Sequence, residues 1–503
     1  MLFNSYTFLF AFLPVTLLGF YVLTTRAPRK VALGWLIVAS IFFYGWYRPE
    51  NLLLLGVLLI LNYGAGSYLG RHSGTPRGRM ILALGIAINL GVLGYFKYAN
   101  FFIEMVNAVF PAHWAAANIV LPLGISFFIF QKIAYLVDAY HGRARGYSFI
   151  DYCLFVTFFP QLIAGPIVHH TEVVPQFSRR ERYRPNAEDL SVGLTQFCCG
   201  LFKKVVIADR MALYATPIFD ATASGSVPGF VDAWIATLAY TFQLYFDFSG
   251  YSDMALGLGR LFGIKLPLNF DSPYKAVNIT EFWRRWHITL SRFLRDYLYI
   301  PLGGNRKGPT RRSVNLMVTM LLGGLWHGAG WNFVIWGGLH GVFLVIHHAW
   351  RALRSRKVSS DDPGSVFGMW GGRALTFFVI MLAWVFFRAS TLGAAGKMFT
   401  ALFGMNAIDW HSSFKIAPTL TALFLVWLMV WFLPNTQEWL ANFNPALGYE
   451  KPGGTTVDAR GRPPLFARLA WQPTTRWALV LAALAVFTIT QMSRVSEFIY
   501  WQF

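Results

Sequence analysis

Long apolar runs separated by short polar connections dominate the chain. Runs of this length are typical of helices that cross a bilayer, where every backbone polar group must be bonded within its own segment. The pattern predicts an all-α polytopic membrane protein, with one integral-membrane domain over residues 1–503, core motifs within 121–350 and a polar loop at 435–475. The expected spans lie near residues 8–23, 32–47, 51–69, 80–98, 119–137, 190–207, 231–249, 313–335, 336–350, 372–390, 417–434 and 476–492.

The composition agrees with this class. Of the 503 residues, 55% are hydrophobic, 17% are aromatic and only 13% are charged, which is far more apolar than a soluble domain of this size. The net charge of +20 does not indicate nucleic-acid binding, because the Lys and Arg residues stand in short clusters between apolar runs. The three cysteines at 153, 198 and 199 lie in or beside apolar stretches and are expected to be ordinary buried residues.

The basic clusters predict the topology. Residues 26–30 and 71–79 form basic connections with two expected spans between them, so both can face the cytoplasm and the N-terminus then lies outside. The loops at 141–145 and 351–357 are further cytoplasmic candidates. The first apolar run lacks a basic leader and a small-residue cleavage pattern, so it is expected to be a span and not a signal peptide.

The segment LLGGLWHGAGWNFVIWGGLHG at 321–341 combines polar side chains with glycines inside an apolar region. Its two histidines, three tryptophans and seven glycines are expensive in hydrocarbon unless they line a cavity or a protein interior. Glycines beside a histidine would let backbone or a thin ligand approach closely, although helix packing is an equally ordinary role for them. The candidate site residues in this segment are His327, Trp326, Gly328, Asn332 and His340.

The stretch 242–304 mixes acids, amides and hydroxyls with apolar residues too often for a simple span. Residues 279–299 have the pattern of one amphipathic helix at the membrane interface, and Asn278 and Glu281 resemble its capping pair. His287 lies at the edge of the apolar stripe of this helix, and Trp283 is a further candidate lining residue.

Other polar residues are expected to have structural roles. Asp247 and Asp253 fall within an apolar region and need partners, and an ion pair with an arginine such as Arg260 is favoured over catalysis. The histidine pairs at 169–170 and 347–348 do not predict a metal site. Adjacent histidines point to different faces of a helix, and no carboxylate or thiolate set completes a site.

Five runs closely resemble the membrane-bound O-acyltransferase superfamily, and within it the bacterial alginate O-acetyltransferase branch. They are LPLGISFFIFQ at 121–131, FFPQLIAGPI at 158–167, QLYFDFSGYSDMALGLG at 243–259, NITEFWRRWHITLSRFLRDYLYIPLGGNRKG at 278–308, and the glycine-rich segment at 321–341. The resemblance implies a ring of about eleven transmembrane helices, with re-entrant and interfacial helices, around a central funnel or tunnel. It also implies that His327 is catalytic and that His287 lies in the same reaction chamber.

The chemistry of acetyl transfer fits these histidines. A base must remove the proton of a sugar hydroxyl as its oxygen attacks a thioester, and imidazole titrates near neutral pH. His327 is the expected base, and His287 can supply a hydrogen bond. The chain has no GxSxG motif, which favours direct transfer without a covalent serine intermediate.

The resemblance also implies substrates, partners and location. The expected donor is a cytoplasmic thioester, either acetyl-CoA or another acetyl thioester, with no bound cofactor and no metal. The acceptor is an extracytoplasmic polysaccharide such as alginate, reached directly or through a periplasmic acetyltransferase or acetyl-carrying partner protein. The expected location is the lipid of the bacterial inner membrane. A polysaccharide transporter or flippase, or a structural subunit of an export complex, stays open as an alternative, but we find neither repeated halves nor paired broken helices.

The basic loops generate a test of orientation. We expect cysteines introduced at Arg77 and Arg354 to be shielded from a membrane-impermeant thiol reagent that is applied to intact cells. Labelling at both positions would invert the topology.

Overall fold

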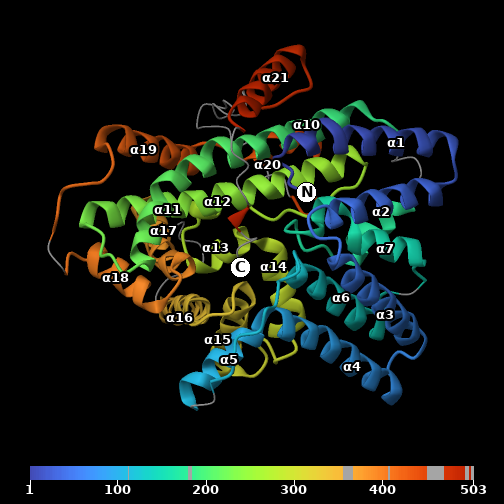
Figure 1. Ribbon diagram of the computed structural model, residues 1–503, viewed down its shortest axis with the longest axis horizontal. Coiled ribbons are helices and arrows are strands. Elements are labelled where there is room, and N and C mark those ends of the chain that lie inside the picture. The colour runs from blue at the N-terminus through green and yellow to red at the C-terminus, as the bar shows by residue number, and fades with distance from the viewer. Residues whose placement is uncertain are drawn as a thin grey trace. The chain divides into compact units, whose positions relative to one another are not determined.

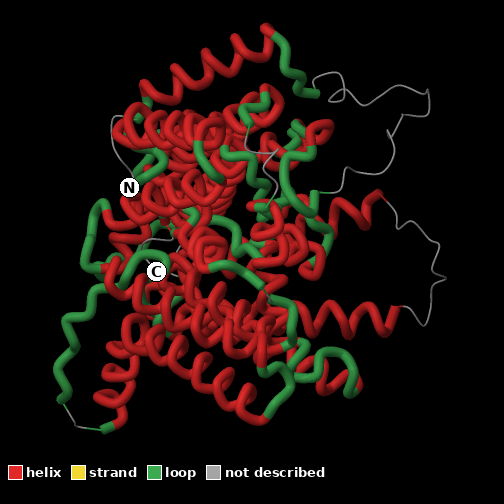
Figure 2. The backbone as a smooth tube through the Cα atoms, turned by 90° about the vertical axis from the view of Figure 1, so that its right-hand side faces the viewer, coloured by secondary structure: helices red, strands yellow, loops and turns green. Residues whose placement is uncertain are grey.

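Helices form nearly all of the regular secondary structure, and loops join them (Figure 2). The computed structural model describes residues 1–110, 113–144, 146–178, 184–354, 366–405, 408–449, 470–492 and 498–499. Within these ranges the one extended pairing is an isolated bridge between Pro267 and Leu447. Arg145, residues 355–357 of the predicted cytoplasmic loop and positions 450–469 of the predicted polar loop lie outside the described residues.

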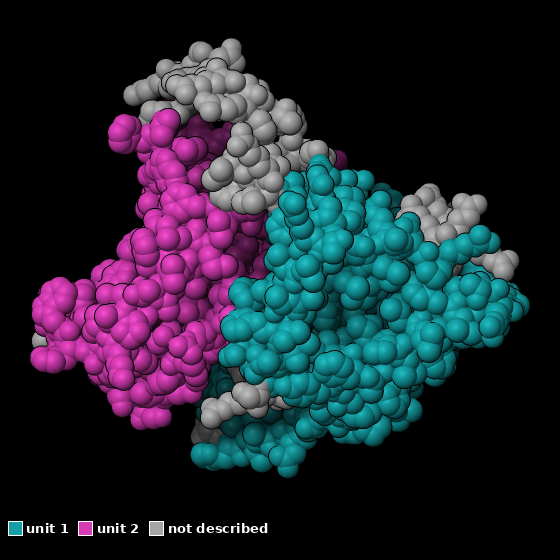
Figure 3. Space-filling model, turned by 90° about the horizontal axis from the view of Figure 1, so that it is seen from above, with its two compact units in different colours: residues 1–202, 250–268, 436–502 teal, residues 203–249, 269–435, 503 magenta. Residues whose placement is uncertain are grey.

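The chain divides into two compact units, which Figure 3 shows in different colours. The first is formed by residues 1–202, 250–268 and 436–502, and the second by residues 203–249 and 269–435. The long helix α12, Phe230–Leu261, contributes its first part to the second unit and its last part to the first.

The first unit contains the N-terminal helices and two helices from the C-terminal part of the chain (Figure 1). A π-helical turn at Phe8–Phe12 leads into its first helix. The helices are α1 Leu13–Arg26, α2 Arg29–Gly45, α3 Asn51–Arg71, α4 Pro76–Leu93, α5 Ala99–Val109, α6 Ile125–Tyr140, α7 Phe149–Thr157, α8 Phe159–Leu162, α9 His170–Phe177, α10 Ala187–Phe202, α20 Thr436–Trp439 and α21 Thr475–Thr490.

The second unit contains the glycine-rich segment and the segment of His287. Apart from the start of α12, its helices are α11 Asp209–Ala223, α13 Ile279–Arg285, α14 Ile288–Leu294, α15 Gly308–His327, α16 Trp331–Arg354, α17 Val366–Arg388, α18 Leu392–Leu402 and α19 Ile416–Phe432. All the candidate site residues of the sequence analysis therefore belong to this unit.

Within the part of the chain that the structure describes, six helical stretches are long and apolar enough to cross a membrane, judged by length and composition. They are Phe8–Arg26, Asn51–Arg71, Pro76–Val109, Ala187–Ala223, Trp331–Arg354 and Val366–Arg388. Many large apolar side chains on these helices are exposed, for example Leu18 at 68% and Leu53 at 75%. Such exposure would favour aggregation in water but suits a surface that faces lipid.

Two expected helix boundaries are wrong. Residues 279–299 do not form one amphipathic helix, because α13 ends at Arg285, α14 begins at Ile288, and His287 has a left-handed backbone with φ 43°. The expected boundary near 335 also moves, since α15 ends at His327 and α16 begins at Trp331. In both places the helical spacing of apolar side chains continues across the break. The sequence pattern therefore does not indicate where the helix ends.

The predicted polar loop at 435–475 is not a simple loop in its described first part. Residues 436–439 form α20, and a short 3₁₀ turn follows at Ala441–Phe443. Thr436, Gln437 and Leu440 are buried. Thr436 and Gln437 therefore pack inside the first unit, whereas Asn442 and Asn444 are exposed.

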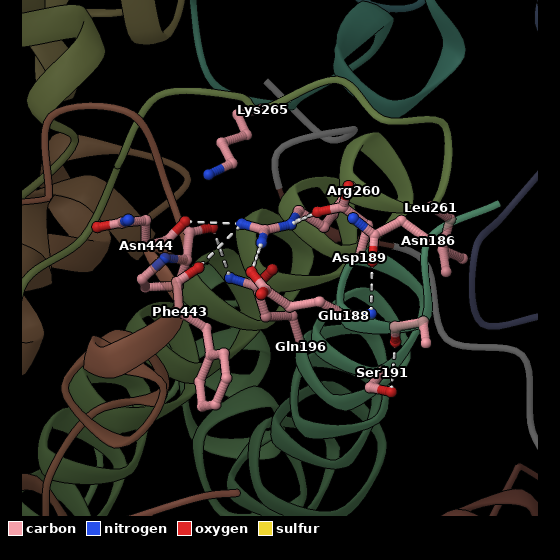
Figure 4. Close-up of polar contacts among 12 residues, drawn as sticks. Asn186, Glu188, Asp189, Ser191, Gln196, Arg260, Leu261, Lys265, Phe443 and Asn444 are labelled. Atoms are coloured by element: carbon pink, nitrogen blue, oxygen red, sulfur yellow. Dashed lines mark hydrogen bonds and ion pairs between the residues drawn. The ribbon is translucent and has the colours of Figure 1, made fainter. Parts of the chain in front are cut away.

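Arg260 has different partners from those expected. Its side chain is 2% exposed, and it forms ion pairs with Asp189 and with Glu188, the latter at 3.0 Å (Figure 4). It also donates to the backbone carbonyls of Phe443 at 3.1 Å and Asn444 at 2.7 Å. The guanidinium thus joins the start of α10, the end of α12 and the segment after α20, and a buried charge is tolerated because it is paired and hydrogen-bonded.

The two aspartates have other partners. Asp247 forms an ion pair with Lys204 at 2.7 Å, within the second unit. Asp253, in the first unit, accepts hydrogen bonds from Thr436 Oγ1 at 2.7 Å and Gln437 Nε2 at 2.6 Å. The expectation that these carboxylates need partners is confirmed, whereas the choice of Arg260 is wrong.

Helices α15 and α16 form a tightly packed antiparallel hairpin. A Cβ atom on Gly324 would lie 2.2 Å from the carbonyl oxygen of Phe333, and one on Gly337 would lie 2.2 Å from the carbonyl oxygen of Met320. The two glycines face each other, since each Cβ would also lie 3.1 Å from the other residue's Cα. Small residues at such crossings let helix backbones approach closely in membranes.

This crossing generates a prediction about stability. Replacing Gly324 with alanine should destabilise the folded protein by roughly 1–3 kcal/mol, because the methyl group meets backbone that cannot move aside. Gly338→Ala is the matched control, since its Cβ would lie 3.4 Å from a Leu321 side-chain atom, an ordinary contact. The measurement is the thermal unfolding midpoint of both variants in detergent. Equal midpoints would show that the crossing tolerates a methyl group.

Candidate active site

The segment around His287 begins with a capped helix. The predicted capping pair is confirmed, because Asn278 Oδ1 accepts from the backbone N–H of Glu281 at 2.9 Å. The Glu281 carboxylate accepts in turn from the backbone N–H of Val277 at 2.9 Å. After the helix α13, the backbone turns at His287, whose side chain is completely buried. A left-handed backbone is unusual for a residue other than glycine, so local bonds must hold it.

Asn269 provides these bonds. Its backbone oxygen accepts from the N–H of Ile288 at 3.0 Å, and its Oδ1 accepts from the Thr289 N–H at 3.3 Å and Oγ1 at 2.8 Å. The same Oδ1 lies 3.1 Å from Nδ1 of His287. Because a backbone N–H can only donate, this atom of Asn269 is the amide oxygen, and Nδ1 of a neutral His287 must carry its proton. Nε2 of His287 is then the nitrogen with the lone pair.

His327 is the last residue of α15, and its side chain is buried. Aromatic rings surround it, with centroid distances of 4.9 Å to Trp326, 5.0 Å to Trp336 and 5.2 Å to Phe387. The centroid of the His287 ring lies 6.5 Å away. The carbonyl end of a helix carries partial negative charge, which favours the imidazolium that forms when this ring accepts a proton.

His340 belongs to the same aromatic cluster as His327. The Trp336 ring contacts both histidines, with its centroid 4.7 Å from that of His340. Trp283, on α13, lies 5.1 Å from His340 and 5.9 Å from Trp336. An unbroken helix would place the two histidines on different sides, but the break between α15 and α16 brings them to one cluster.

The side-chain amide of Asn332, in the first turn of α16, has a structural hydrogen bond through its nitrogen. Its Nδ2 donates to the backbone carbonyl of Ala389 at 2.5 Å, just after α17. Trp331 is 53% exposed and does not line the cluster. Behind the cluster, Trp384 stacks on Trp336 at 5.5 Å and donates to Tyr274 Oη at 3.1 Å.

Gly328 is required by the packing of a neighbouring ring. A Cβ atom there would lie 2.1 Å from the ring of Phe333. That ring contacts Phe387 at 5.2 Å, and Phe387 contacts His327 at the same centroid distance. The glycine therefore leaves room for the aromatic rings that position the histidine.

The arrangement can perform proton transfer in a largely apolar setting. It contains three buried imidazoles, indole N–H groups and an amide oxygen close to one another. Among the described residues no group of three or more His, Cys, Asp or Glu side chains can hold a metal ion. The imidazole, indole and amide groups themselves offer acid–base and hydrogen-bond catalysis.

The sequence located most of this cluster. His287, His327, Trp326, Trp283 and His340 are brought together. Sequence reasoning missed Asn269, Phe387 and Trp384. The amide in the short run LPLNF at 266–270 was the available signal for Asn269, whereas the two aromatic residues lie in an expected span where nothing distinguishes them.

Comparisons of the sequence with known proteins show which family it resembles. The sequence model described as MBOAT, membrane-bound O-acyltransferase family, matches residues 140–392. A peptidoglycan O-acetyltransferase of Helicobacter pylori is 45% identical over 435 residues, which cover 81% of each chain. A probable alginate O-acetylase AlgI of Pseudomonas putida is 40% identical over the whole of both chains. A teichoic acid D-alanyltransferase of Streptococcus thermophilus is 31% identical over 48% of this chain and 59% of its own.

Buried histidines suited to proton transfer, apolar helices long enough to cross a bilayer, and a full-length relationship to named acyltransferases lead to one conclusion. The chain belongs to the membrane-bound O-acyltransferase family and is a multi-pass membrane O-acyltransferase.

Proposed function

We propose that the protein takes acetyl groups from a cytoplasmic thioester, acetyl-CoA or another acetyl thioester, and passes them across the bacterial inner membrane. The acetyl groups then modify hydroxyls of an extracytoplasmic polysaccharide such as alginate. The observation that carries the proposal is His327, buried among aromatic rings 6.5 Å from His287. One relative named a peptidoglycan O-acetyltransferase and another named a probable alginate O-acetylase support the acetyl group and the class of acceptor.

In the proposed reaction, His327 takes the proton of the attacking hydroxyl. The new C–O bond forms as the C–S bond of the thioester breaks, and the same proton returns from His327 to the leaving thiolate sulfur. His287 presents its lone pair at Nε2, since Asn269 holds the proton on Nδ1. It therefore accepts a hydrogen bond from a neighbouring hydroxyl of the acceptor, which orients the attacking group.

The attacking hydroxyl belongs either to the polymer itself or to a periplasmic acetyl-carrying partner protein. Both alternatives use the same proton transfer at His327, so this residue does not distinguish between them. Peptidoglycan is the second polymer to consider, because the Helicobacter pylori relative bears that name. Acetyl content should therefore be measured on both secreted polysaccharide and peptidoglycan.

The first prediction tests the base. His327→Ala and His327→Gln should each lower acetyl transfer by at least about 10², the usual contribution of a positioned base. The measurement is acetyl content per sugar in polymer from strains with matched protein levels. His411→Ala is the control, because that side chain is 97% exposed and lies outside the cluster.

Two outcomes would contradict this assignment. Normal acetylation of the polymer in the His327→Ala strain would contradict the proposed role of His327 as the base. Loss of polymer export, with normal acetyl content on the polymer that escapes, would show instead that the protein moves polysaccharide.

The second prediction tests the packing beside the base. Gly328→Ala should lower the turnover rate by roughly tenfold or more, because displaced rings would shift His327 from its productive position. Gly330→Ala is the matched control, since its Cβ would lie 3.7 Å from the Phe333 ring. The measurement is kcat of both purified variants with one thioester donor and one oligosaccharide acceptor. An unchanged kcat in Gly328→Ala would show that the Phe333 ring does not position the histidine.

A further inference from the structure

A long apolar groove lies between the helices α12, α17 and α19, within the second unit. Its volume is about 720 Å³, which is in the range of cavities that hold small molecules. The side chains that line it are all apolar or aromatic, and four of them are tryptophans, at positions 234, 370, 427 and 431. None of these residues belongs to the histidine cluster, so the groove is a separate feature.

The groove has the length of one membrane leaflet. It follows α17 over residues 370–381 and α19 over residues 420–431, and each of these stretches is about 16 Å long at 1.5 Å per residue. The hydrocarbon core of a bilayer is about 30 Å thick, so one leaflet supplies about 15 Å of it. A transmembrane helix of a partner needs about twice the length of the groove. The length therefore favours an acyl chain as the occupant.

One end of the groove carries positive charge. There the start of α17 meets the end of α19, and the ring centroids of Trp370 and Trp431 are 5.8 Å apart. The guanidinium carbon of Arg373 lies 5.1 Å from the centroid of the Trp370 ring. Lys275 lies at the same end, because its Nζ donates to the carbonyl of Leu433, just after α19, at 2.7 Å. Tryptophans together with basic residues are typical of the membrane–water interface.

Arg373 has capacity left for an anion. Within the part of the chain that the structure describes, its Nε has no hydrogen-bond partner, and neither has Nε1 of Trp431. The side chain of Arg373 is only partly buried, so its outer N–H groups stay accessible. The neighbouring carboxylates of Asp271 and Glu281 both pair with Arg285, at 3.9 Å and 2.8 Å. The basic end of the groove therefore suits a phosphate group, which accepts several hydrogen bonds and carries negative charge.

We propose that this groove binds an anionic phospholipid. The phosphate contacts Arg373, and one acyl chain lies along the tryptophans toward Met381. The basic segment at 351–357 precedes α17, and its predicted cytoplasmic position assigns the lipid to the cytoplasmic leaflet. Anionic lipids of that leaflet are attracted to basic residues near the membrane surface. A zwitterionic lipid has the same chains, but its cationic group cancels the charge that Arg373 and Lys275 attract.

The experiment measures lipid binding to the purified full chain in detergent by native mass spectrometry. Phosphatidylglycerol and phosphatidylcholine with identical oleoyl chains are titrated separately. The wild-type protein should bind phosphatidylglycerol about tenfold more tightly, the usual effect of a hydrogen bond to a charged group. Phosphatidylglycerol with two six-carbon chains should bind at least about tenfold more weakly than the oleoyl lipid, because less apolar surface is buried.

Variants of the basic end test recognition of the headgroup. Arg373→Gln should lose most of the preference for phosphatidylglycerol over phosphatidylcholine and still bind both lipids through their chains. Arg373→Lys keeps the positive charge and should retain most of the preference. Arg354→Gln is the matched control, because this arginine is exposed at the end of α16 and does not line the groove. It removes the same charge and should keep the full preference.

A second pair of variants tests the groove itself. Ala374 lines the groove, so Ala374→Trp fills the space and should weaken the binding of both oleoyl lipids by about tenfold. Leu375→Trp is the matched control, since Leu375 is 64% exposed and lies outside the groove. It adds an indole at the next position of α17 and should leave both affinities unchanged.

Three outcomes would overturn the proposal. An unchanged preference for phosphatidylglycerol in Arg373→Gln would show that Arg373 does not recognise the headgroup. Equal affinities for the six-carbon and oleoyl forms of phosphatidylglycerol would show a phosphate site without a chain site. If Ala374→Trp keeps lipid binding but separates a dimer or a co-purifying membrane protein, a protein helix and not a lipid occupies the groove.

Discussion

The close approach of α15 and α16 at Gly324 and Gly337 is the constraint on which the candidate site depends. It places the end of one helix, with His327, against the side of the next, with Trp336. Neither position can carry a side chain without moving backbone. The chain turns between the two helices in only three residues, so the crossing and the short turn together fix the direction of the imidazole. The packing of these two helices therefore also determines the geometry of the candidate site.

The sequence predicted where helices lie better than where they break. Apolar runs located the helices, because lipid requires each span to satisfy its own backbone. The left-handed turn at His287 was not predictable, since the apolar spacing of residues 279–299 continues through it. The Asn269 bonds that hold this turn join residues 18 and 20 positions apart, and no local pattern reports such pairing.

The sequence predicted that buried charges have partners, but it did not predict which residues these partners are. A carboxylate inside an apolar region must be paired, and this held for Asp247 and Asp253. The arginine nearest in sequence was the wrong choice, because Arg260 faces the start of α10 and carbonyls beyond α20. The histidines were easier to locate, since neighbouring glycines and tryptophans mark them in one continuous segment.

The discontinuous first unit has a consequence for biosynthesis. Asp253 receives its hydrogen bonds from Thr436 and Gln437, which are synthesised more than 180 residues later. The carbonyls of Phe443 and Asn444, to which Arg260 donates, are likewise synthesised later than the arginine. During insertion these two buried charges must be held by other means, such as the early partners Glu188 and Asp189 for the arginine. The start of α10 and the last part of α12 therefore reach their final packing only when the segment at 436–444 has been made.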